Sequence, residues 1–396
     1  MKDKIRLGVI GAGSVVREIY QHLFFHSRYS AILEIAGVAD PDPVCRDWFG
    51  NLAGLPASRR FTRHRDLIAA GGLDAVQVNT PDHLHAQPAL DALAAGLDVV
   101  VPKPTAATLK DAHAMVAAAR AAGRFLGVDF HKRDDPRVVE AAARYQSGRY
   151  GAFQAGVFYM LDKLLVADPN HEPRFFASPD FAANNSPISF LTVHLADLLL
   201  QIVPLTPTAV RAIGHRHKLP SLRPIPVEGY DVVDTEITFD TGATAHLLTG
   251  WAIPNTAWAT TVQSGRLICS EGLIDLELDR PGLRETHADG FAEINPLFRQ
   301  FGHDGLVSGY GISNPGCLYE QVLARHQGRL SAEDLERALA PRALGLPTTL
   351  VLEAAERSLA LATRTRAGSS LGGSVDLQEL AAKELGTEVA GRYGFA

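Results

Sequence analysis

Lys103 lies in the stretch VVVPKPT, in which an apolar run ends at a single cation held between two prolines. The run predicts a buried strand at 98–101, and each proline restricts the φ angle of its own residue. A lysine fixed at the end of a buried strand can donate hydrogen bonds to a ligand oxygen or neutralise an anion. A surface lysine that happens to follow a strand is the alternative interpretation.

A second candidate group lies on a helix. The stretch SPISFLTVHLADLLLQIV predicts a helix at about 187–202, with Ser186 as its N-cap. Phe190, His194 and Asp197 are spaced i, i+4 and i+7, which places them on one helix face. A neutral imidazole at position 194 can accept a proton, although the apolar ring of Phe190 beside it disfavours the charged form. A buried histidine with a satisfied hydrogen bond is the alternative.

A glycine-rich turn opens the chain in IRLGVIGAGSVVREIY, where Gly11 and Gly13 separate a predicted strand from a predicted helix. Gly11 allows the tight turn, and Gly13 lets the main chain approach a pyrophosphate at the helix N-terminus. Val16 replaces the third glycine of this pattern, which serves helix–strand packing. The strand at 33–39 is followed by Asp40, whose carboxylate can accept both ribose hydroxyls of NAD and would repel the 2′-phosphate of NADP. A tight turn and an ordinary surface aspartate are the alternative.

A parallel sheet would bring these residues together. Short apolar strands alternate with amphipathic helices, which predicts right-handed βαβ units, the strands being 5–10, 33–39, 74–79, 98–101 and 125–128. Ligands of such sheets bind at the carboxyl ends of the strands, where the stretch VNTPDHLH also ends a strand. We therefore expect an NAD-binding Rossmann domain over residues 1–128. The residues expected at the cofactor are Gly11, Gly13, Ser14, Val15, Asp40, Thr80, Pro81, His85 and Lys103.

After residue 129 the pattern changes to strands joined by tight turns, as in VVDTEITFDTGATAHLLTGWAI. This predicts a second, α+β domain over 129–396 with a large, mostly antiparallel open sheet, interrupted by the helix at 187–202. Helices return after Ser331, which is expected to be an N-cap. Polar groups expected to line a substrate pocket are Lys163, Asp197, Arg133 and Tyr310.

The composition excludes several classes of protein. The 396 residues carry a net charge of −6, which argues against a general nucleic-acid binder. The three cysteines form neither a disulfide framework nor a zinc motif. His83 and His85 are two residues apart, but no carboxylate or cysteine completes a metal site at ligand spacing, so no metal is predicted. The chain has no signal peptide at its start and no apolar run of about 20 residues, so we expect a cytoplasmic protein that does not enter membranes.

The order and spacing of several stretches resemble the Gfo/Idh/MocA family, which includes glucose–fructose oxidoreductase and inositol dehydrogenase. They span nearly the whole chain and are GVIGAGS, VADPDP, VNTPDHLH, VVVPKP, GVDFHKRDDPRV with SGRYG, VHLAD and PTTLVLEAAERSLALA. The resemblance implies that Lys103 lies between the nicotinamide and the substrate and that the Lys103–Pro104 bond is cis. It also implies a C-terminal sheet that often forms the oligomer interface. In two places this chain departs from the family pattern: Pro102 replaces a glutamate, and Phe190 replaces an aspartate.

The resemblance implies an NAD-dependent oxidoreductase acting on a secondary hydroxyl of a sugar, cyclitol or sugar derivative. In that interpretation hydride passes to nicotinamide, His194 takes the hydroxyl proton, and Lys103 orients the substrate oxygen. The partners expected are a small polyhydroxylated substrate and further copies of the chain, as a dimer or tetramer. Because both usual carboxylates are missing, a non-catalytic NAD-binding sensor stays open as an alternative. A redox-neutral enzyme that retains its NAD is the other.

Overall fold

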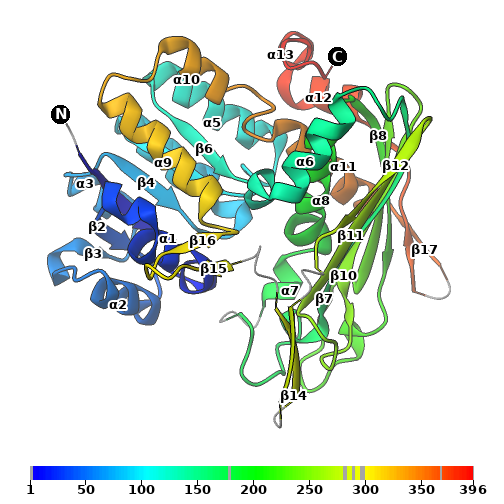
Figure 1. Ribbon diagram of the computed structural model, residues 1–396, viewed down its shortest axis with the longest axis horizontal. Coiled ribbons are helices and arrows are strands. Elements are labelled where there is room, and N and C mark those ends of the chain that lie inside the picture. The colour runs from blue at the N-terminus through cyan, green and yellow to red at the C-terminus, as the bar shows by residue number, and fades with distance from the viewer. Residues whose placement is uncertain are drawn as a thin grey trace. The chain divides into compact units, whose positions relative to one another are not determined.

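The computed structural model describes residues 3–176, 180–279, 283–287, 290–294, 299–365 and 368–395 (Figure 1). The chain divides into two compact units, each assembled from two segments. The first unit is Met1–Asp134 with Phe298–Thr349, and the second is Asp135–Leu297 with Leu350–Ala396. No helix of the described part is both long and apolar enough to cross a bilayer.

The first unit contains a six-stranded sheet in the order β3-β2-β1-β4-β5-β6, and every neighbouring pair is parallel. This is the strand order of a Rossmann fold, as predicted. The strands are β1 Ile5–Ile10, β2 Leu33–Ala39, β3 Arg60–Phe61, β4 Ala75–Val78, β5 Asp98–Pro102 and β6 Leu126–Asp129. The short β3 was not predicted because its two residues carry no apolar run.

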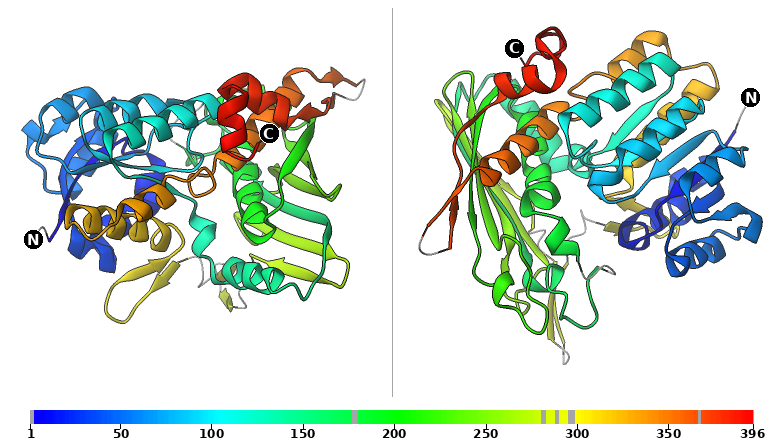
Figure 2. Two further views of the ribbon diagram at one scale, coloured as in Figure 1. Left: turned by 90° about the horizontal axis from the view of Figure 1, so that it is seen from above. Right: turned by 180° about the vertical axis from the view of Figure 1, so that it is seen from behind.

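Helices cover both faces of this sheet (Figure 2). They are α1 Gln21–His26, α2 Pro43–Leu52, α3 His64–Ala69, α4 Ala86–Ala94, α5 Leu109–Ala122, α9 Ser313–His326 and α10 Ala332–Ala338. A π-helical turn, Val16–Tyr20, precedes α1. Helix α5 ends at Gly123, whose φ of 59° is the left-handed conformation that glycine adopts readily. Ser331 caps α10 by accepting a hydrogen bond from the Asp334 N–H, as expected.

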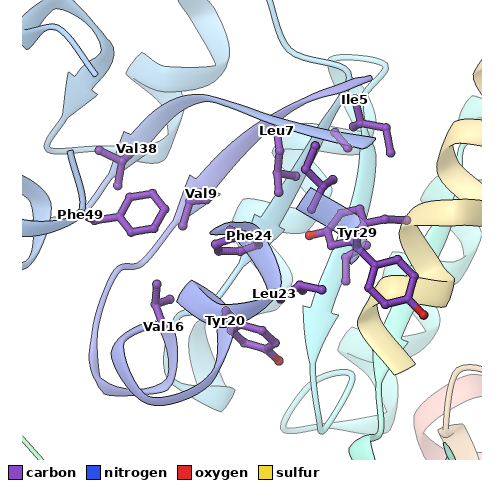
Figure 3. Close-up of a cluster of buried hydrophobic side chains, with 14 of the residues drawn as sticks. Ile5, Leu7, Val9, Val16, Tyr20, Leu23, Phe24, Tyr29, Val38 and Phe49 are labelled. Atoms are coloured by element: carbon purple, nitrogen blue, oxygen red, sulfur yellow. The ribbon is translucent and has the colours of Figure 1, made fainter. Parts of the chain in front are cut away.

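The core of the first unit lies between the sheet and the helices on one of its faces. Val9 and Val38 come from neighbouring strands, Tyr20 from the π-helical turn, Phe24 from α1, and Phe49 from α2 (Figure 3). Helix α9, from the later segment, adds Tyr319 and Val322 to the same cluster. Residues far apart in the sequence therefore share one core.

The second unit is built on a nine-stranded sheet in the order β12-β11-β7-β10-β9-β8-β18-β17, with β19 beside β8. Only β7 and β10 are parallel neighbours, so the sheet is mostly antiparallel, as predicted. The strands are β7 Phe153–Lys163, β8 Pro207–His215, β9 Val232–Phe239, β10 Thr244–Ile253, β11 Thr261–Cys269, β12 Gly272–Glu277, β17 Thr363–Arg364, β18 Ser370–Leu371 and β19 Val375–Asp376. In this unit β13 Leu283–His287 also pairs with β14 Gly290–Ile294, whereas the separate pair of β15 Arg299–Phe301 with β16 Val307–Gly309 belongs to the first unit.

The helix predicted at about 187–202 consists of a π-helical turn, Ile188–Thr192, followed by α8, Val193–Ile202. Ser186 precedes it, and its hydroxyl accepts hydrogen bonds from the N–H groups of Ile188 and Ser189. The other helices of this unit are α6 Pro136–Gln146, α7 Phe181–Asn184, α12 Leu377–Leu385 and α13 Thr387–Arg392. Helix α11, Leu346–Ala360, contains the division between the two units.

The division of the chain differs from the expected boundary after residue 128. The first unit continues to Asp134 and also includes the later segment Phe298–Thr349. This later segment belongs to the first unit because apolar residues of α9 complete the core described above. Helix periodicity in the sequence shows that α9 has an apolar face, but it does not show which sheet that face covers.

Candidate functional site

The glycine-rich turn lies between β1 and the first helix. Gly11 has a φ of +86°, and a Cβ there would stand 2.8 Å from the Asn79 carbonyl oxygen, so only glycine fits. A Cβ added at Gly13 would meet nothing within 4 Å, which leaves open space where a phosphate could approach. Ser14 and Val15 follow and are partly exposed, whereas Val16 is fully buried in the core. Val16 thus performs the packing role of the missing third glycine.

Asp40 connects the end of β2 to this turn. The residue is 7% exposed, and its carboxylate accepts hydrogen bonds from the Ala12 N–H at 2.7 Å and the Asp42 N–H at 2.8 Å. Each carboxylate oxygen has a second lone pair, so Asp40 can still accept ribose hydroxyls. The carboxylate therefore holds the glycine-rich turn in place.

The loop after β4 packs against the same turn. The Asn79 side-chain amide donates to the Gly11 carbonyl at 3.2 Å, and Gln77 donates to the Asn79 side-chain oxygen at 2.9 Å. The Thr80 hydroxyl is buried without a hydrogen-bond partner among the described atoms. Pro81 beside it is exposed. The Thr80 main chain lies against Gly11, so a buried hydroxyl without a partner beside the glycine-rich turn fits a bound dinucleotide.

Lys103 follows β5 at the same edge of the sheet. Its side chain is partly buried, and the Lys103–Pro104 bond is cis, as expected. Pro102 pairs with Asp129 of β6, so the two side chains lie on the same face of the sheet. The position where the family has glutamate is therefore next to a carboxylate on the neighbouring strand.

Asp129 is fully buried and belongs to a polar cluster of the first unit. Tyr20 donates its hydroxyl to Asp129 Oδ2 at 2.8 Å, and His131 Nδ1 lies 2.8 Å from the same oxygen. The His131 ring lies 4.5 Å from the ring of Tyr310. Burial, followed by the Asp129 charge, raises the pKa of Tyr20 well above 10.0, so this phenol stays protonated. No spacing in the sequence connects Tyr20 with this cluster, because the partners are 109 residues apart.

Two of the predicted polar residues have main-chain or aromatic partners. Arg133 donates to the Ala343 carbonyl at 2.6 Å and lies 4.1 Å from the ring of Phe130. These contacts give Arg133 a structural role. The Lys132 ammonium lies 5.7 Å from the Tyr310 ring, which places Tyr310 beside a buried cation.

In the second unit, His194 and Asp197 are both buried on α8, with exposed fractions of 7% and 3%. Phe190 precedes them in the π-helical turn, and its ring packs against Phe181 at 5.0 Å and Trp251 at 5.6 Å. Phe176, 3.9 Å from Phe181, completes an aromatic cluster that the sequence pattern did not predict, because its members come from four separate segments. Lys163 ends β7 and is partly buried.

The structure thus brings the expected cofactor residues to one edge of the first unit. His194, Asp197 and Lys163 belong to the second unit. Among the described residues, no group of three or more histidine, cysteine, aspartate or glutamate side chains could hold a metal ion.

A parallel sheet in the order 3-2-1-4-5-6, with a glycine-rich turn after its first strand, defines a nucleotide-binding Rossmann protein. Residues 5–130 match the family described as "Oxidoreductase family, NAD-binding Rossmann fold", with the short name GFO_IDH_MocA. This match places residues 5–130 in the family whose motifs the sequence resembles.

Curated relatives match the N-terminal part of the chain. A 1,5-anhydro-D-fructose reductase from Ensifer adhaerens is 34% identical over 158 residues, which are 40% of this chain and 46% of that protein. An inositol 2-dehydrogenase from Corynebacterium glutamicum is 27% identical over 152 residues, 38% of this chain and 44% of that protein. The matched stretches thus span less than half of these relatives.

Solved structures extend the likeness to the whole fold. Scyllo-inositol dehydrogenase from Lactobacillus casei, with bound NAD(H) and scyllo-inositol, has a TM-score of 0.66 and 16% identity, covering 89% of this chain and 96% of that one. An Agrobacterium radiobacter oxidoreductase in complex with NAD+, L-tartaric acid and magnesium has a TM-score of 0.67 and 21% identity, covering 95% and 99%. At these identities the likeness shows the shared fold.

Proposed function

We propose that this protein is an NAD-dependent oxidoreductase that reversibly oxidises a secondary hydroxyl of a sugar, cyclitol or sugar derivative. The observation that carries the proposal is the convergence of the glycine-rich turn, Asp40 and Lys103 at one edge of the parallel sheet. A 1,5-anhydro-D-fructose reductase and inositol 2-dehydrogenases among the relatives support a polyol as the substrate class.

The proposed roles follow from the chemistry of each residue. The Lys103 ammonium donates a hydrogen bond to the substrate oxygen and stabilises negative charge there as the proton leaves. The His194 imidazole accepts that proton on a ring nitrogen. When bound, NAD supplies the acceptor for the carbinol hydride. Asp40 accepts the ribose hydroxyls and selects NAD over NADP, while Lys163, Asp197 and Tyr310 are proposed to line the substrate.

The first experiment mixes the purified protein and NAD with a panel of inositols and anhydro sugars, and follows nicotinamide reduction by its near-ultraviolet absorbance. Lys103→Ala should abolish hydride transfer while NAD still binds, because the removed ammonium acts on the substrate oxygen. Lys110→Ala, at an exposed position on α5, is the matched control. Full turnover by the Lys103 variant would remove this residue from the mechanism.

The absence of the usual carboxylates at positions 102 and 190 suggests two alternative functions. Pro102 and Phe190 occupy the places of the usual carboxylates, and Phe190 belongs to an aromatic cluster. A protein that binds NAD and a ligand without turnover would reduce no NAD with any member of the panel. A redox-neutral enzyme would instead co-purify with NAD that does not exchange with added cofactor.

We also propose that copies of this chain associate through the outer face of the nine-stranded sheet. Val157 and Tyr159 of β7 point to this face, as do Ile268 of β11 and Leu273 of β12. Their exposed fractions are 49%, 37%, 41% and 53%, which is unusual for a run of large apolar side chains on neighbouring strands. A cytoplasmic location is proposed with it, since the three cysteines are free.

A further inference from the structure

His85 connects two loops at the carboxyl edge of the six-stranded sheet. Its exposed fraction is 0%, its Nδ1 lies 2.9 Å from the Pro104 carbonyl oxygen, and its Nε2 lies 3.0 Å from the Thr80 carbonyl oxygen. Thr80 follows β4, whereas Pro104 follows β5 and directly succeeds Lys103. One imidazole therefore links the ends of two neighbouring strands through both of its nitrogens.

Both partners of the ring are carbonyl oxygens, which only accept hydrogen bonds. A neutral imidazole has one N–H group and donates to one loop, whereas an imidazolium has two and donates to both. Burial is the largest cause that lowers the pKa of His85 below 6.5. Lys103 acts in the same direction, while Asp82 and the two carbonyls oppose it. At neutral pH the ring is therefore neutral, and the two loops compete for one N–H.

Because both nitrogens of His85 contact main-chain carbonyls, its role differs from the cofactor contact expected from the sequence. A fully buried ring with a carbonyl oxygen at each nitrogen presents no group to a cofactor or a metal. We propose that His85 is a positioning residue. Through the Pro104 carbonyl it sets the direction of Lys103, and through the Thr80 carbonyl it sets the loop expected at the nicotinamide cofactor.

Thr105, which follows Pro104, provides a second contact that holds the chain after Lys103. The Thr105 hydroxyl donates to the Leu344 carbonyl, so the chain after Lys103 is anchored on both sides of the Pro104–Thr105 link. Loss of the His85 hydrogen bond to the Pro104 carbonyl would leave the Thr105 hydrogen bond to Leu344 as the remaining contact of this pair. The action of Lys103 on a substrate rests on the proposed function, whereas the placement of its ammonium does not.

Three substitutions separate the two contacts. Asparagine reaches about as far as Nδ1, so His85→Asn keeps a donor towards Pro104. Glutamine reaches about as far as Nε2, so His85→Gln keeps a donor towards Thr80. His85→Phe keeps the ring volume and has no donor. His83→Asn and His83→Gln are matched controls at an exposed neighbouring histidine.

The readout for Lys103 needs no substrate. Reductive methylation with carbon-13 formaldehyde labels the eight lysines of the chain, and Lys103→Arg identifies the Lys103 signal by its loss. In His85→Phe and His85→Gln this signal should move towards that of exposed Lys110, whereas in His85→Asn it should stay nearer the wild-type position. With a substrate, kcat should fall roughly tenfold to a hundredfold in the Phe and Gln variants, and less in the Asn variant.

For NAD binding, the Asn and Gln variants should exchange places: Asn should have the larger effect and Gln the smaller. The Kd for NAD, measured by calorimetry, should rise in His85→Asn and His85→Phe and change little in His85→Gln. If the Lys103 signal is unchanged in the folded Phe variant, or if Asn and Gln affect both readouts equally, His85 is only a packing residue. Failure of all three variants to fold would also count against positioning. Full turnover by Lys103→Ala would refute the proposed function, while the methyl signal would still test this inference.

Discussion

At the scale of single residues, Asp40 combines a structural and a binding role. Its two oxygens hold Ala12 of the glycine-rich turn and Asp42 of the following loop. The free lone pairs of the same oxygens are those proposed to bind ribose. Any substitution of Asp40 therefore changes the turn as well as the binding group, and a test has to separate the two.

A comparison of NAD with NADP in Asp40→Asn separates them, because a change in the turn affects both cofactors alike. The amide keeps one acceptor oxygen, loses the other and loses the negative charge, so NAD affinity should fall about tenfold to a hundredfold, since hydrogen bonds to charged groups contribute about 1.5–3 kcal/mol. Affinity for NADP should fall less, because the repulsion of the 2′-phosphate is removed. Calorimetric titration with both cofactors checks this, with Asp42→Asn as the control. Equal losses for both cofactors would contradict the ribose assignment.

The second residue prediction concerns the buried Asp129 carboxylate. Tyr20→Phe removes the hydroxyl that donates to Asp129 Oδ2, while Oδ1 already has no partner among the described atoms. His131 remains beside Oδ2, but a hydrogen bond to a charged group contributes about 1.5–3 kcal/mol, so the free energy of unfolding should decrease by about that amount. Urea unfolding measures it, and Tyr150→Phe, at a partly exposed position outside the proposed interface, should change stability little. A stable Tyr20 variant would show that another donor takes over.

At the scale of elements, sequence patterns predicted five of the six strands of the parallel sheet to within a residue or two. Their apolar runs are buried on both sides, and that pattern is strong in the sequence. The π-helical turn before α8 was not predicted, because the sequence Ile188–Thr192 reads as ordinary helix. The extra residue in that turn alters the geometry between Phe190 and His194. A rule of i and i+4 spacing therefore does not fix how these side chains are arranged.

Phe190→Asp tests whether this helix can accept the carboxylate that the family usually has. The substitution removes a ring that packs against Phe181 and Trp251 and places a charge beside them. We expect a loss of about 3 kcal/mol in unfolding free energy, in the range for removing a packed aromatic ring, and no gain in turnover. Phe190→Leu, which keeps much of the apolar volume, is the control. A Phe190→Asp variant that is both stable and more active would contradict the structural role of the cluster.

At the scale of the whole molecule, the two domain types were predictable, but the path of the chain between them was not. Alternating and hairpin patterns are local, so they identified the parallel sheet and the mostly antiparallel sheet. The return of Phe298–Thr349 to the first unit depends on contacts such as Tyr319 with Gln77, which are 242 residues apart. Likewise, the motifs selected Lys103 and His194, whereas the double contact of His85 could be found only from coordinates.

The outer face of the nine-stranded sheet leads to a prediction about assembly. Val157, Tyr159, Ile268 and Leu273 lie on neighbouring strands of one face, so an association through it would bury all four together. Leu273→Lys places a charge on that face without affecting the inner side chains of the sheet, because Leu273 points outwards. The mass measured by light scattering should drop from that of an oligomer to that of a single chain of 42.6 kDa. Val139→Lys, at an equally exposed apolar position on α6, is the control and should leave the mass unchanged.

A wild-type protein that already has the mass of one chain would reject this interface, and so would an oligomer that persists in a folded Leu273 variant.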